Sequence, residues 1–173
     1  GSPHNDIDVV KKISKNDARV IGINHSRNFG SQMAFRSGME LSTKQAVVLL
    51  DGDLQDPPEL IKDFVKKWLE GNDVVYGTRI KREMPFFWGL MYKVFYRIFS
   101  SLSFIKIPLD AGDFSLLDKR VVSWILKCPE RDLFMRGIRA FVGFKQVGVD
   151  YIRPARVFGK STNSLFKNIG WAK

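Results

Sequence analysis

Residues 46–59 read AVVLLDGDLQDPPE, and the run passes from an apolar segment to a helix start through one acidic turn. The apolar residues 46–50 are typical of a strand buried on both faces. Asp56, which is followed by two prolines, is typical of a helix start and is the candidate N-cap. Asp51 and Asp53 are therefore expected at the carboxyl end of a central strand, where open α/β sheets place their ligand crevice.

The same turn has the side chains that a hard divalent cation binds. Asp51 and Asp53 are separated by one glycine, and the amide of Gln55 follows. Oxygen ligands of this kind suit a cation that keeps open positions for phosphate oxygens. The alternative interpretation is an acidic turn that only caps a helix. The acid-Gly-acid spacing, the buried strand before it and the basic sequence around it favour the metal site, because functional residues concentrate on such loops.

The chain of 173 residues is sized for one domain with a hydrophobic core. Its apolar periodicity and its start and stop signals predict helices over 6–16, 31–41, 57–70, 119–127 and 133–142, and strands over 19–23, 46–50, 73–78, 109–117 and 145–152. Gly71 is the predicted stop of the third helix. This alternation indicates an α/β fold with a mostly parallel sheet and helices on both of its faces.

Residues 84–105 interrupt the alternation with a dense apolar and aromatic segment. Lys93 and Arg97 lie in its middle and belong to one polar stripe at helical spacing. Because central Lys and Arg are costly in hydrocarbon, a membrane span is not expected. The segment instead predicts an amphipathic helix that lies on a membrane surface. The alternative is a helix packed in the core or against a second copy of the chain, which leaves a homo-oligomer open.

The formal net charge of +10 is not spread evenly. Residues 131–173 have nine Lys and Arg against two Asp and Glu, whereas residues 46–76 are acidic on balance. A basic lobe beside an acidic loop fits a protein that binds phosphates near a metal. The basic residues follow no recognisable nucleic-acid module, so no nucleic acid is expected as partner, and anionic lipid headgroups explain the charge at least as well. The single cysteine, Cys128, excludes an internal disulfide.

Residues 51–59, DGDLQDPPE, resemble the D-x-D-L-Q-D-P-P-E signature of the inverting family 2 glycosyltransferases. The most similar branch is that of dolichyl-phosphate-mannose synthase and the bacterial polyprenyl-phosphate glycosyltransferases. Further matches follow in the expected order: 26–30 (SRNFG), 75–79 (VYGTR), 110–114 (DAGDF), 136–137 (RG) and 151–156 (YIRPAR). Because these ordered matches span nearly the whole chain, the resemblance is specific.

The resemblance implies a GT-A-type fold and the transfer of a sugar, with inversion, from a nucleoside diphosphate to a polyprenyl phosphate. The donor diphosphate is expected to bind at four side chains, namely Asp51, Asp53, Gln55 and Arg79. A metal ion, Mg²⁺ or Mn²⁺, is expected at Asp53 and Gln55, where it would stabilise the charge of the leaving diphosphate. Oxygen ligands do not distinguish between the two ions.

On the acceptor side, Arg153 and Arg156 resemble the arginines that bind the acceptor phosphate, and guanidinium groups can bind phosphate oxygens through paired hydrogen bonds. The family often has Ser-Lys-Tyr after the glycine that corresponds to Gly159. Here Ser161 is followed by Thr162 and Asn163, so the lysine of that motif is missing, and Lys160 is expected to supply its charge. Asp113 falls at the position of the catalytic carboxylate. A phosphate monoester is already largely ionised at neutral pH, so Asp113 is expected to orient the acceptor or support the metal rather than to act as a strong base.

The resemblance also predicts the organisation of the chain. Residues 1–160 are expected to form a partial GT-A catalytic domain, and residues 161–173 a basic juxtamembrane segment after which the branch commonly has transmembrane helices. The first strand-helix-strand unit of the family, which holds the nucleotide base, is expected to be missing, with an exposed sheet edge as the consequence. The expected location is the cytoplasmic face of a membrane, with the bacterial inner membrane as the first expectation.

Two alternatives to transfer onto a lipid stay open. A glycosyltransferase with a soluble sugar acceptor would need no lipid, and residues 84–105 would then belong to its core. A non-catalytic phosphate-binding module on a membrane surface would show no metal-dependent binding of a nucleoside diphosphate.

Overall fold

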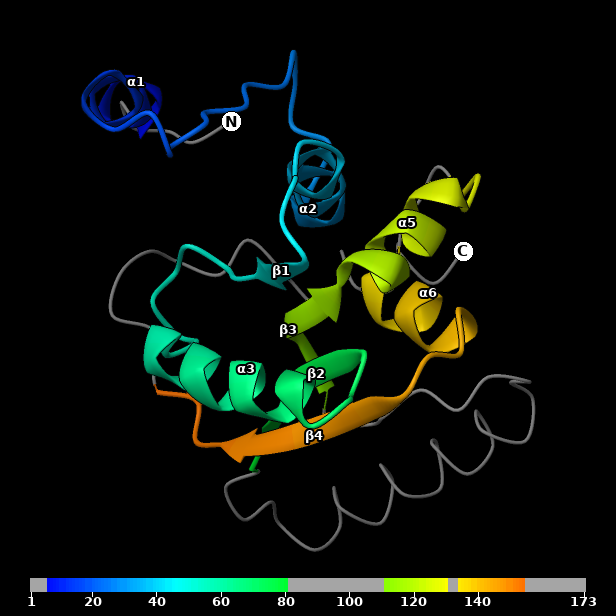
Figure 1. Ribbon diagram of the computed structural model, residues 1–173. Helices are drawn as coiled ribbons and strands as arrows, with labels where there is room; N and C mark the ends of the chain where they lie inside the picture. The colour runs from blue at the N-terminus through cyan, green and yellow to red at the C-terminus, as the bar shows by residue number, and fades with distance from the viewer. Residues whose placement is uncertain (1–5, 81–110, 131–133, 155–173) are drawn as a thin grey trace, which may run out of the picture.

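The computed structural model of the chain describes residues 6–80, 111–130 and 134–154 (Figure 1). In chain order, its elements are α1 (Asp6–Asn16), α2 (Ser31–Glu40), β1 (Ala46–Leu49), the 3-10 helix η1 (Pro58–Leu60), α3 (Ile61–Leu69), β2 (Val74–Arg79), β3 (Ala111–Asp118), α5 (Lys119–Lys127), α6 (Met135–Phe141) and β4 (Gln146–Tyr151). Apart from one predicted strand, these elements agree with the sequence-based predictions to within a few residues.

The strands form one mixed sheet in the order β1-β3-β2-β4. Strand β3 is antiparallel to both of its neighbours, and β2 pairs with β4 in parallel. Strands β1, β2 and β4 therefore point in the same direction, as predicted, and within the described sheet β3 alone is reversed. Because β2 and β3 are antiparallel neighbours, β3 begins at the edge of the sheet where β2 ends. That edge collects the carboxyl ends of β1, β2 and β4 and the amino end of β3.

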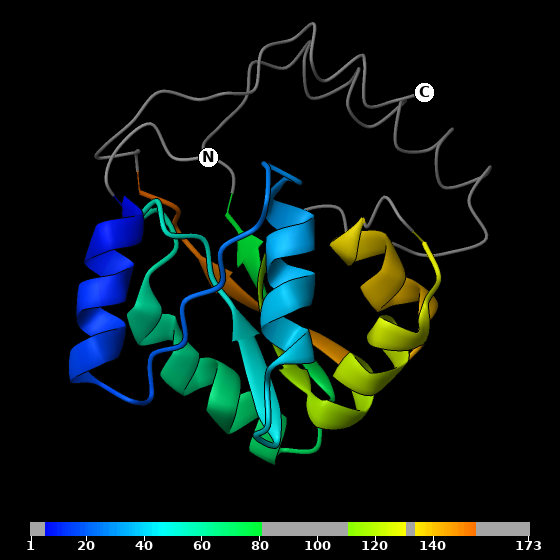
Figure 2. The ribbon, with the colours of Figure 1, turned by 90° about the horizontal axis from the view of Figure 1, so that it is seen from above.

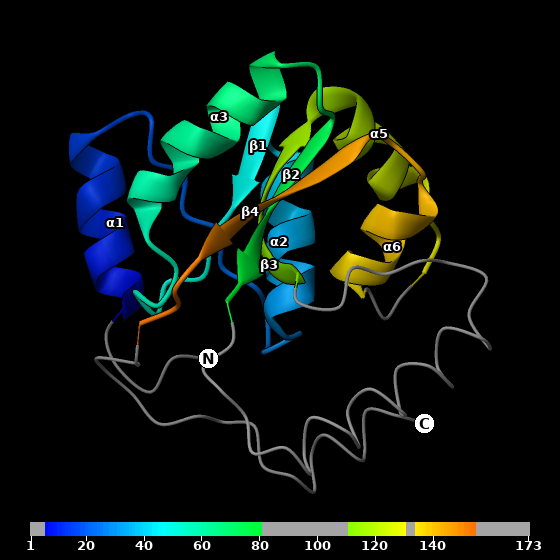
Figure 3. The ribbon, with the colours of Figure 1, turned by 90° about the horizontal axis from the view of Figure 1, so that it is seen from below.

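Helices cover both faces of the sheet, which confirms the predicted α/β class (Figures 2 and 3). Successive strand residues point to opposite faces, so Val74 and Val75 belong to different cores. On one face, α3 inserts Phe64 among Val75, Phe114, Leu116 and Tyr151. The other face is covered by α2, α5 and α6, whose buried apolar residues are Met39, Val121, Val122, Ile125, Met135 and Ile138.

The predicted strand over 19–23 does not form, and this prediction is wrong. In the described chain these residues pair with no strand. A Cβ on Gly22 would lie 2.7 Å from Val10 Cγ1, so the segment runs beside α1. Ile21 and Ile23 are 68% and 46% exposed, so they contribute no buried strand face. An apolar run alone cannot specify a strand, because the ladder also needs a partner. Strand β1 is left as an edge of the described sheet.

The helix ends confirm one predicted stop signal and show one cap that was not predicted. Gly71 has φ of 89° and follows α3, as predicted for a helix stop. Asp118 caps α5, because its side chain accepts a hydrogen bond from the backbone N–H of Arg120. The predicted helix over 57–70 is split into η1 and α3, since its first turn is a 3-10 turn led by prolines. Residues 84–105, the predicted interfacial helix, and residues 161–173, the predicted juxtamembrane segment, lie outside the described residues.

Candidate active site

Charged side chains gather at the edge where β1, β2 and β4 end and β3 begins. Asp51 follows β1, Arg79 ends β2, and Asp113 lies near the start of β3. The last pair in the register of β1 with β3 is Leu49 with Ser115. Continuing that register by two residues would set Asp51 opposite Asp113, and the two carboxylates do repel each other. The reversal of β3 is therefore what brings the predicted catalytic carboxylate to the predicted donor site.

The turn after β1 is closed by its own polar groups. The backbone N–H of Gln55 donates to Asp53 Oδ1 over 3.2 Å, an Asx-type turn. Leu54 between them has φ of 58°, a left-handed conformation that is uncommon for a residue with a side chain. Gln55 Nε2 donates to the carbonyl oxygen of Pro154 over 3.3 Å, which ties the turn to the chain after β4. Since its nitrogen is used in this way, the amide oxygen of Gln55 is the end that can accept.

Asp56 does not cap the following helix, contrary to the prediction. Pro57 is the N-cap of η1, and no side-chain hydrogen bond caps that helix. The side chain of Asp56 is buried, with the residue 2% exposed, and accepts a hydrogen bond from the hydroxyl of Tyr151. It also forms an ion pair with Arg153, whose Nε lies 3.2 Å from Asp56 Oδ1. A buried carboxylate needs partners of this kind, and a single backbone N–H of a short helix would not replace them.

Two arginines flank the buried Asp56. Arg153 Nη2 lies 3.6 Å from Asp53 Oδ2, so one guanidinium spans both carboxylates. Arg79 Nε donates to the hydroxyl of Tyr151 over 3.5 Å. Burial alone would lower the pKa of Arg79, but Tyr151 and the nearby carboxylates raise it. The hydroxyl of Tyr151 therefore links one arginine to the carboxylate that the other arginine contacts.

Gly112 and Arg139 shape the start of β3. A Cβ on Gly112 would lie 3.1 Å from Arg79 Nη2. The absence of a side chain at Gly112 therefore lets the guanidinium of Arg79 pack closely against the backbone of β3. Arg139 on α6 is 0% exposed, and its Nη1 donates to the carbonyl oxygen of Gly112 over 3.3 Å. Its guanidinium lies 4.8 Å from the ring centroid of Tyr76. Burial lowers the pKa of Arg139 to about 10, although Asp113 and Tyr76 act in the opposite direction.

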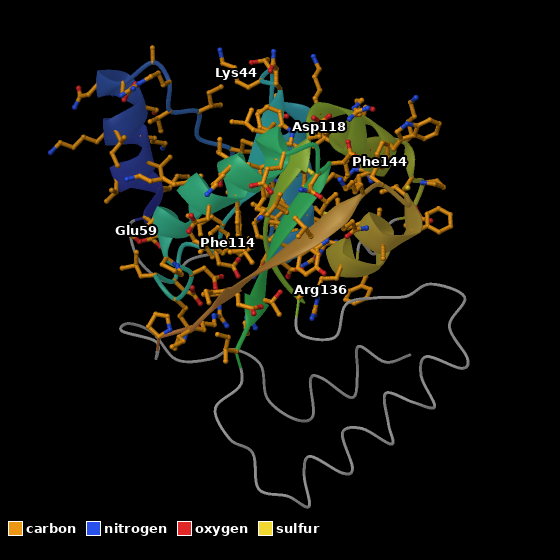
Figure 4. All side chains as sticks on the ribbon, turned by 60° about the horizontal axis from the view of Figure 1, so that its bottom comes forward. Lys44, Glu59, Phe114, Asp118, Arg136 and Phe144 are labelled. Carbon is orange, nitrogen blue, oxygen red and sulfur yellow. The ribbon has the colours of Figure 1, made fainter. Side chains whose placement is uncertain are left out.

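Asp113 is held from two helices. Gln32 on α2 donates through Nε2 to Asp113 Oδ2 over 3.0 Å. Arg136 on α6 forms an ion pair across 3.6 Å, between its Nε and Asp113 Oδ1. Figure 4 shows Arg136 at the end of the sheet opposite to Lys44 and Asp118, which places it at the edge described above. The predicted catalytic carboxylate thus has one oxygen in a hydrogen bond and the other facing a cation.

Asp51 shows how closely the carboxylates are gathered. Its pKa is raised, first because the carboxyl is half-buried and then because Asp113, Asp53 and Asp56 repel its charge. Arg153 opposes the effect and does not cancel it. A cation bound among these oxygens would relieve the repulsion.

Residues 1–125 match the family described as Glycosyl transferase family 2. The chain belongs to this family. It is 42% identical over 168 residues to a protein of Bacillus subtilis (strain 168) named uncharacterized glycosyltransferase YkcC, covering 96% of this chain and 52% of that protein. It is 36% identical over 157 residues to the bactoprenol glucosyl transferase of Shigella phage SfX, covering 88% of this chain and 50% of the relative.

A third relative, uncharacterized glycosyltransferase sll0501 of Synechocystis sp. (strain ATCC 27184 / PCC 6803 / Kazusa), is 42% identical over 147 residues, covering 84% of this chain and 46% of that protein. The chain spans about half the length of the curated relatives it matches. The family confirms the resemblance drawn from residues 51–59, and the mixed sheet with helices on both faces is consistent with the GT-A fold that this resemblance implies.

The oxygen ligands of the acidic turn would suit a divalent metal ion if phosphate oxygens of a substrate completed its coordination. Among the described residues, no group of three or more His, Cys, Asp or Glu side chains could hold a metal ion. Magnesium, however, is usually bound by one or two carboxylates together with substrate phosphates. Asp53 and the amide oxygen of Gln55 offer such a set of oxygen ligands, and the repulsion felt by Asp51 is what a divalent cation would offset.

Most of the predicted site residues lie together, and two lie outside the described chain. Asp51, Asp53, Gln55, Arg79, Asp113 and Arg153 share one edge of the sheet. Arg156 and Lys160, predicted on the acceptor side, lie outside the described residues. Within the ranges that the structure describes, every helix is too short or too polar to cross a membrane.

Sequence reasoning missed three contributors to the site. Gln32 lies in α2, where the sequence shows no motif. The only available signal was its position in the first helical turn directly after the matched residues 26–30. Tyr151 begins the matched segment 151–156, but no sequence pattern indicates that its hydroxyl donates a hydrogen bond to Asp56. Arg139 was placed on a helix, and a basic residue on a helix is ordinarily exposed. Its burial follows from tertiary packing alone.

Proposed function

We propose that the protein transfers a sugar from a nucleoside-diphosphate sugar to a polyprenyl phosphate, with inversion at the anomeric carbon and with the help of a divalent metal ion. The observation that carries the proposal is one sheet edge where three carboxylates, those of Asp51, Asp53 and Asp113, lie beside Arg79 and Arg153. Such an edge can hold a metal-bound diphosphate next to an anionic acceptor. The relatives named bactoprenol glucosyl transferases support the choice of acceptor.

The acidic turn would bind the donor. Asp53 and the amide oxygen of Gln55 would hold Mg²⁺ or Mn²⁺, and Asp51 would assist the metal or the ribose of the donor. When bound, the metal would stabilise the negative charge on the leaving diphosphate. Arg79 reaches the same edge from β2 and would bind the diphosphate oxygens.

Asp113 and the arginine after β4 would act on the acceptor. An oxygen of the lipid phosphate forms the new bond to the anomeric carbon as the bond to the donor diphosphate breaks, and its entry opposite to the leaving group gives inversion. The phosphate is already largely ionised at neutral pH, so the reaction needs little proton removal by Asp113. Asp113 would instead help to orient the acceptor. Arg153 would bind its oxygens, together with Arg156 and Lys160 further along the chain.

The proposed place of action is the cytoplasmic face of a membrane, with the bacterial inner membrane as first choice. The acceptor is a lipid, so the site must reach a membrane surface. The support comes from sequence: the amphipathic pattern over 84–105 and the basic residues of 161–173 suit anionic headgroups.

The test is a transfer assay on the full-length protein. A panel of labelled nucleotide sugars is offered with polyprenyl phosphate, in Mg²⁺, in Mn²⁺ and with a chelator. We expect transfer to the lipid from one class of donor, and its loss with the chelator. A parallel panel of soluble sugar acceptors is the control. Transfer to a soluble sugar and never to the lipid would overturn the acceptor, and a full set of donors without any transfer or metal-dependent binding would overturn the enzymatic proposal.

The role of Asp113 is tested in the same assay with Asp113→Asn, which keeps the size of the side chain and removes its charge. A large loss of turnover supports a role for the carboxylate. Near-normal turnover would exclude proton removal by this residue.

A further inference from the structure

Gln32 connects three elements through a single side-chain amide. It lies in the first turn of α2 and donates through Nε2 to Asp113 Oδ2 over 3.0 Å. Its Oε1 accepts the backbone N–H of Met135 over 2.9 Å, at the start of α6. The two bonds span 81 and 103 residues of sequence, so the amide joins α2, β3 and α6.

The chemistry of its partners fixes the orientation of this amide. A backbone N–H can only donate, so the oxygen of Gln32 must face Met135. The NH₂ group is then forced to face Asp113, and a flipped amide would lose both bonds. Asp113 Oδ2 is therefore the acceptor of this hydrogen bond.

The second oxygen of Asp113 is in a different environment. Oδ1 is buried and has no hydrogen-bond partner among the described residues, and Arg136 Nε, which faces it across 3.6 Å, likewise has none. At this distance the two atoms form an ion pair but not an ordinary hydrogen bond, and an oxygen could contact both of them only from one side. Arg139 fixes the backbone next to Asp113, because its guanidinium donates a hydrogen bond to the carbonyl oxygen of Gly112. One oxygen of Asp113 is thus held by Gln32, and the other faces the guanidinium of Arg136.

We propose that Gln32 is a positioning residue for Asp113: it holds Oδ2 toward α2 and thereby keeps Oδ1 against Arg136, on the side of the site where the acceptor would bind. The inference rests on the proposed function, because it assumes that Asp113 acts on the acceptor. The proposal adds α2 to the acceptor side of the site. The acceptor-side residues predicted from the sequence lie only in β3 and in the chain after β4. Gln32 itself touches no reacting atom.

The test compares two substitutions in the full-length protein that separate the two bonds of the amide. Gln32→Glu keeps an oxygen for the N–H of Met135 and replaces the donor to Asp113 by a repelling carboxylate. Gln32→Met removes both bonds and keeps the volume. We expect Gln32→Glu to lower kcat about 10- to 100-fold, the range for losing a hydrogen bond to a charged group. The KM for the nucleotide sugar should stay within about 2-fold, since the donor side is unchanged.

A stability cycle gives a readout that needs no activity. Gln32→Glu alone places two carboxylates together and should lower the melting temperature. Adding Asp113→Asn restores a donor to the pair, with donor and acceptor exchanged, and should recover the melting temperature but not kcat. If Gln32→Glu keeps kcat within about 2-fold, or if Asp113→Asn fails to recover the stability it lost, the inference is overturned. Failure of the proposed function is recognised separately, because the unsubstituted protein would then transfer no sugar while the stability cycle still reports the contact.

Discussion

The contact between Tyr151 and Asp56 joins the two arginines of the site, and Tyr151→Phe tests it with little change in shape. The residue is 6% exposed, and its ring packs against Phe114 with centroids 6.1 Å apart, a contact that phenylalanine keeps. Burial and the carboxylate of Asp56 both raise the pKa of Tyr151, so its hydroxyl is protonated at neutral pH and donates. The substitution therefore removes one donor from a buried carboxylate and one acceptor from Arg79.

The expected cost can be worked out from these contacts. A hydrogen bond to a charged group contributes about 1.5–3 kcal/mol. Asp56 keeps its ion pair with Arg153, so we expect a value near the middle of the range, about 2 kcal/mol. For a chain of this size, that corresponds to a fall in melting temperature of roughly 4–8 °C.

The assay is guanidinium unfolding followed by tryptophan fluorescence at pH 7. The midpoint should fall while the slope of the free energy of unfolding against denaturant stays the same, because the surface exposed on unfolding is unchanged. Tyr76→Phe is the matched control, because its hydroxyl hydrogen-bonds to none of the residues that the structure describes. A change below about 0.5 kcal/mol for Tyr151→Phe, no larger than that of an ordinary surface substitution, would refute the reasoning.

Two further predictions concern stability. Gly77→Ala would place a Cβ 2.7 Å from Tyr151 Cε1 and should cost about 1–3 kcal/mol, whereas Gly38→Ala, with nothing within 4 Å inside α2, should stabilise by about 0.5–1 kcal/mol; thermal melts compare the pair, and equal effects would contradict the packing. Asp118→Ala should cost about 2 kcal/mol at pH 7, because it removes the cap of α5 and the acceptor of Trp68 Nε1. Burial would raise the pKa of Asp118, but its hydrogen bonds lower it, so the stability that it contributes is complete above about pH 4 and declines as the pH falls through the lowered pKa. Melts over pH 2–7 should show this difference narrowing toward acid, and a constant difference would contradict it.

Most helices and strands were predicted correctly, because the signals that specify them lie in residues close together in the sequence. The apolar run at 46–50 forms β1, Gly71 ends α3, and α5 occupies the residues predicted for it. The strand over 19–23 failed, because a strand depends on a partner that sequence does not show. The direction of β3 is likewise a matter of topology, and the alternation of elements is silent on it.

The site was predicted as a set of residues, and the structure supplies their pairing. The carboxylates and arginines were singled out by type and spacing, which are local. Asp56 was predicted to cap a helix because it precedes two prolines. Its side chain is instead buried, where it contacts Tyr151 at the end of β4 and Arg153 just after it. Gln32 could not be assigned at all, since its two partners lie 81 and 103 residues away.

The central claim is that the acidic turn binds a nucleoside diphosphate through a divalent metal, and calorimetry of nucleoside diphosphates on the full-length protein tests it most directly. We predict binding in Mn²⁺ or Mg²⁺ that is lost with a chelator and weakened about 10- to 100-fold by Asp53→Asn. Asp63→Asn, an acid-to-amide change at an exposed position on α3, is the matched control and should leave binding unchanged. Binding that persists with the chelator and is indifferent to Asp53→Asn would contradict the account.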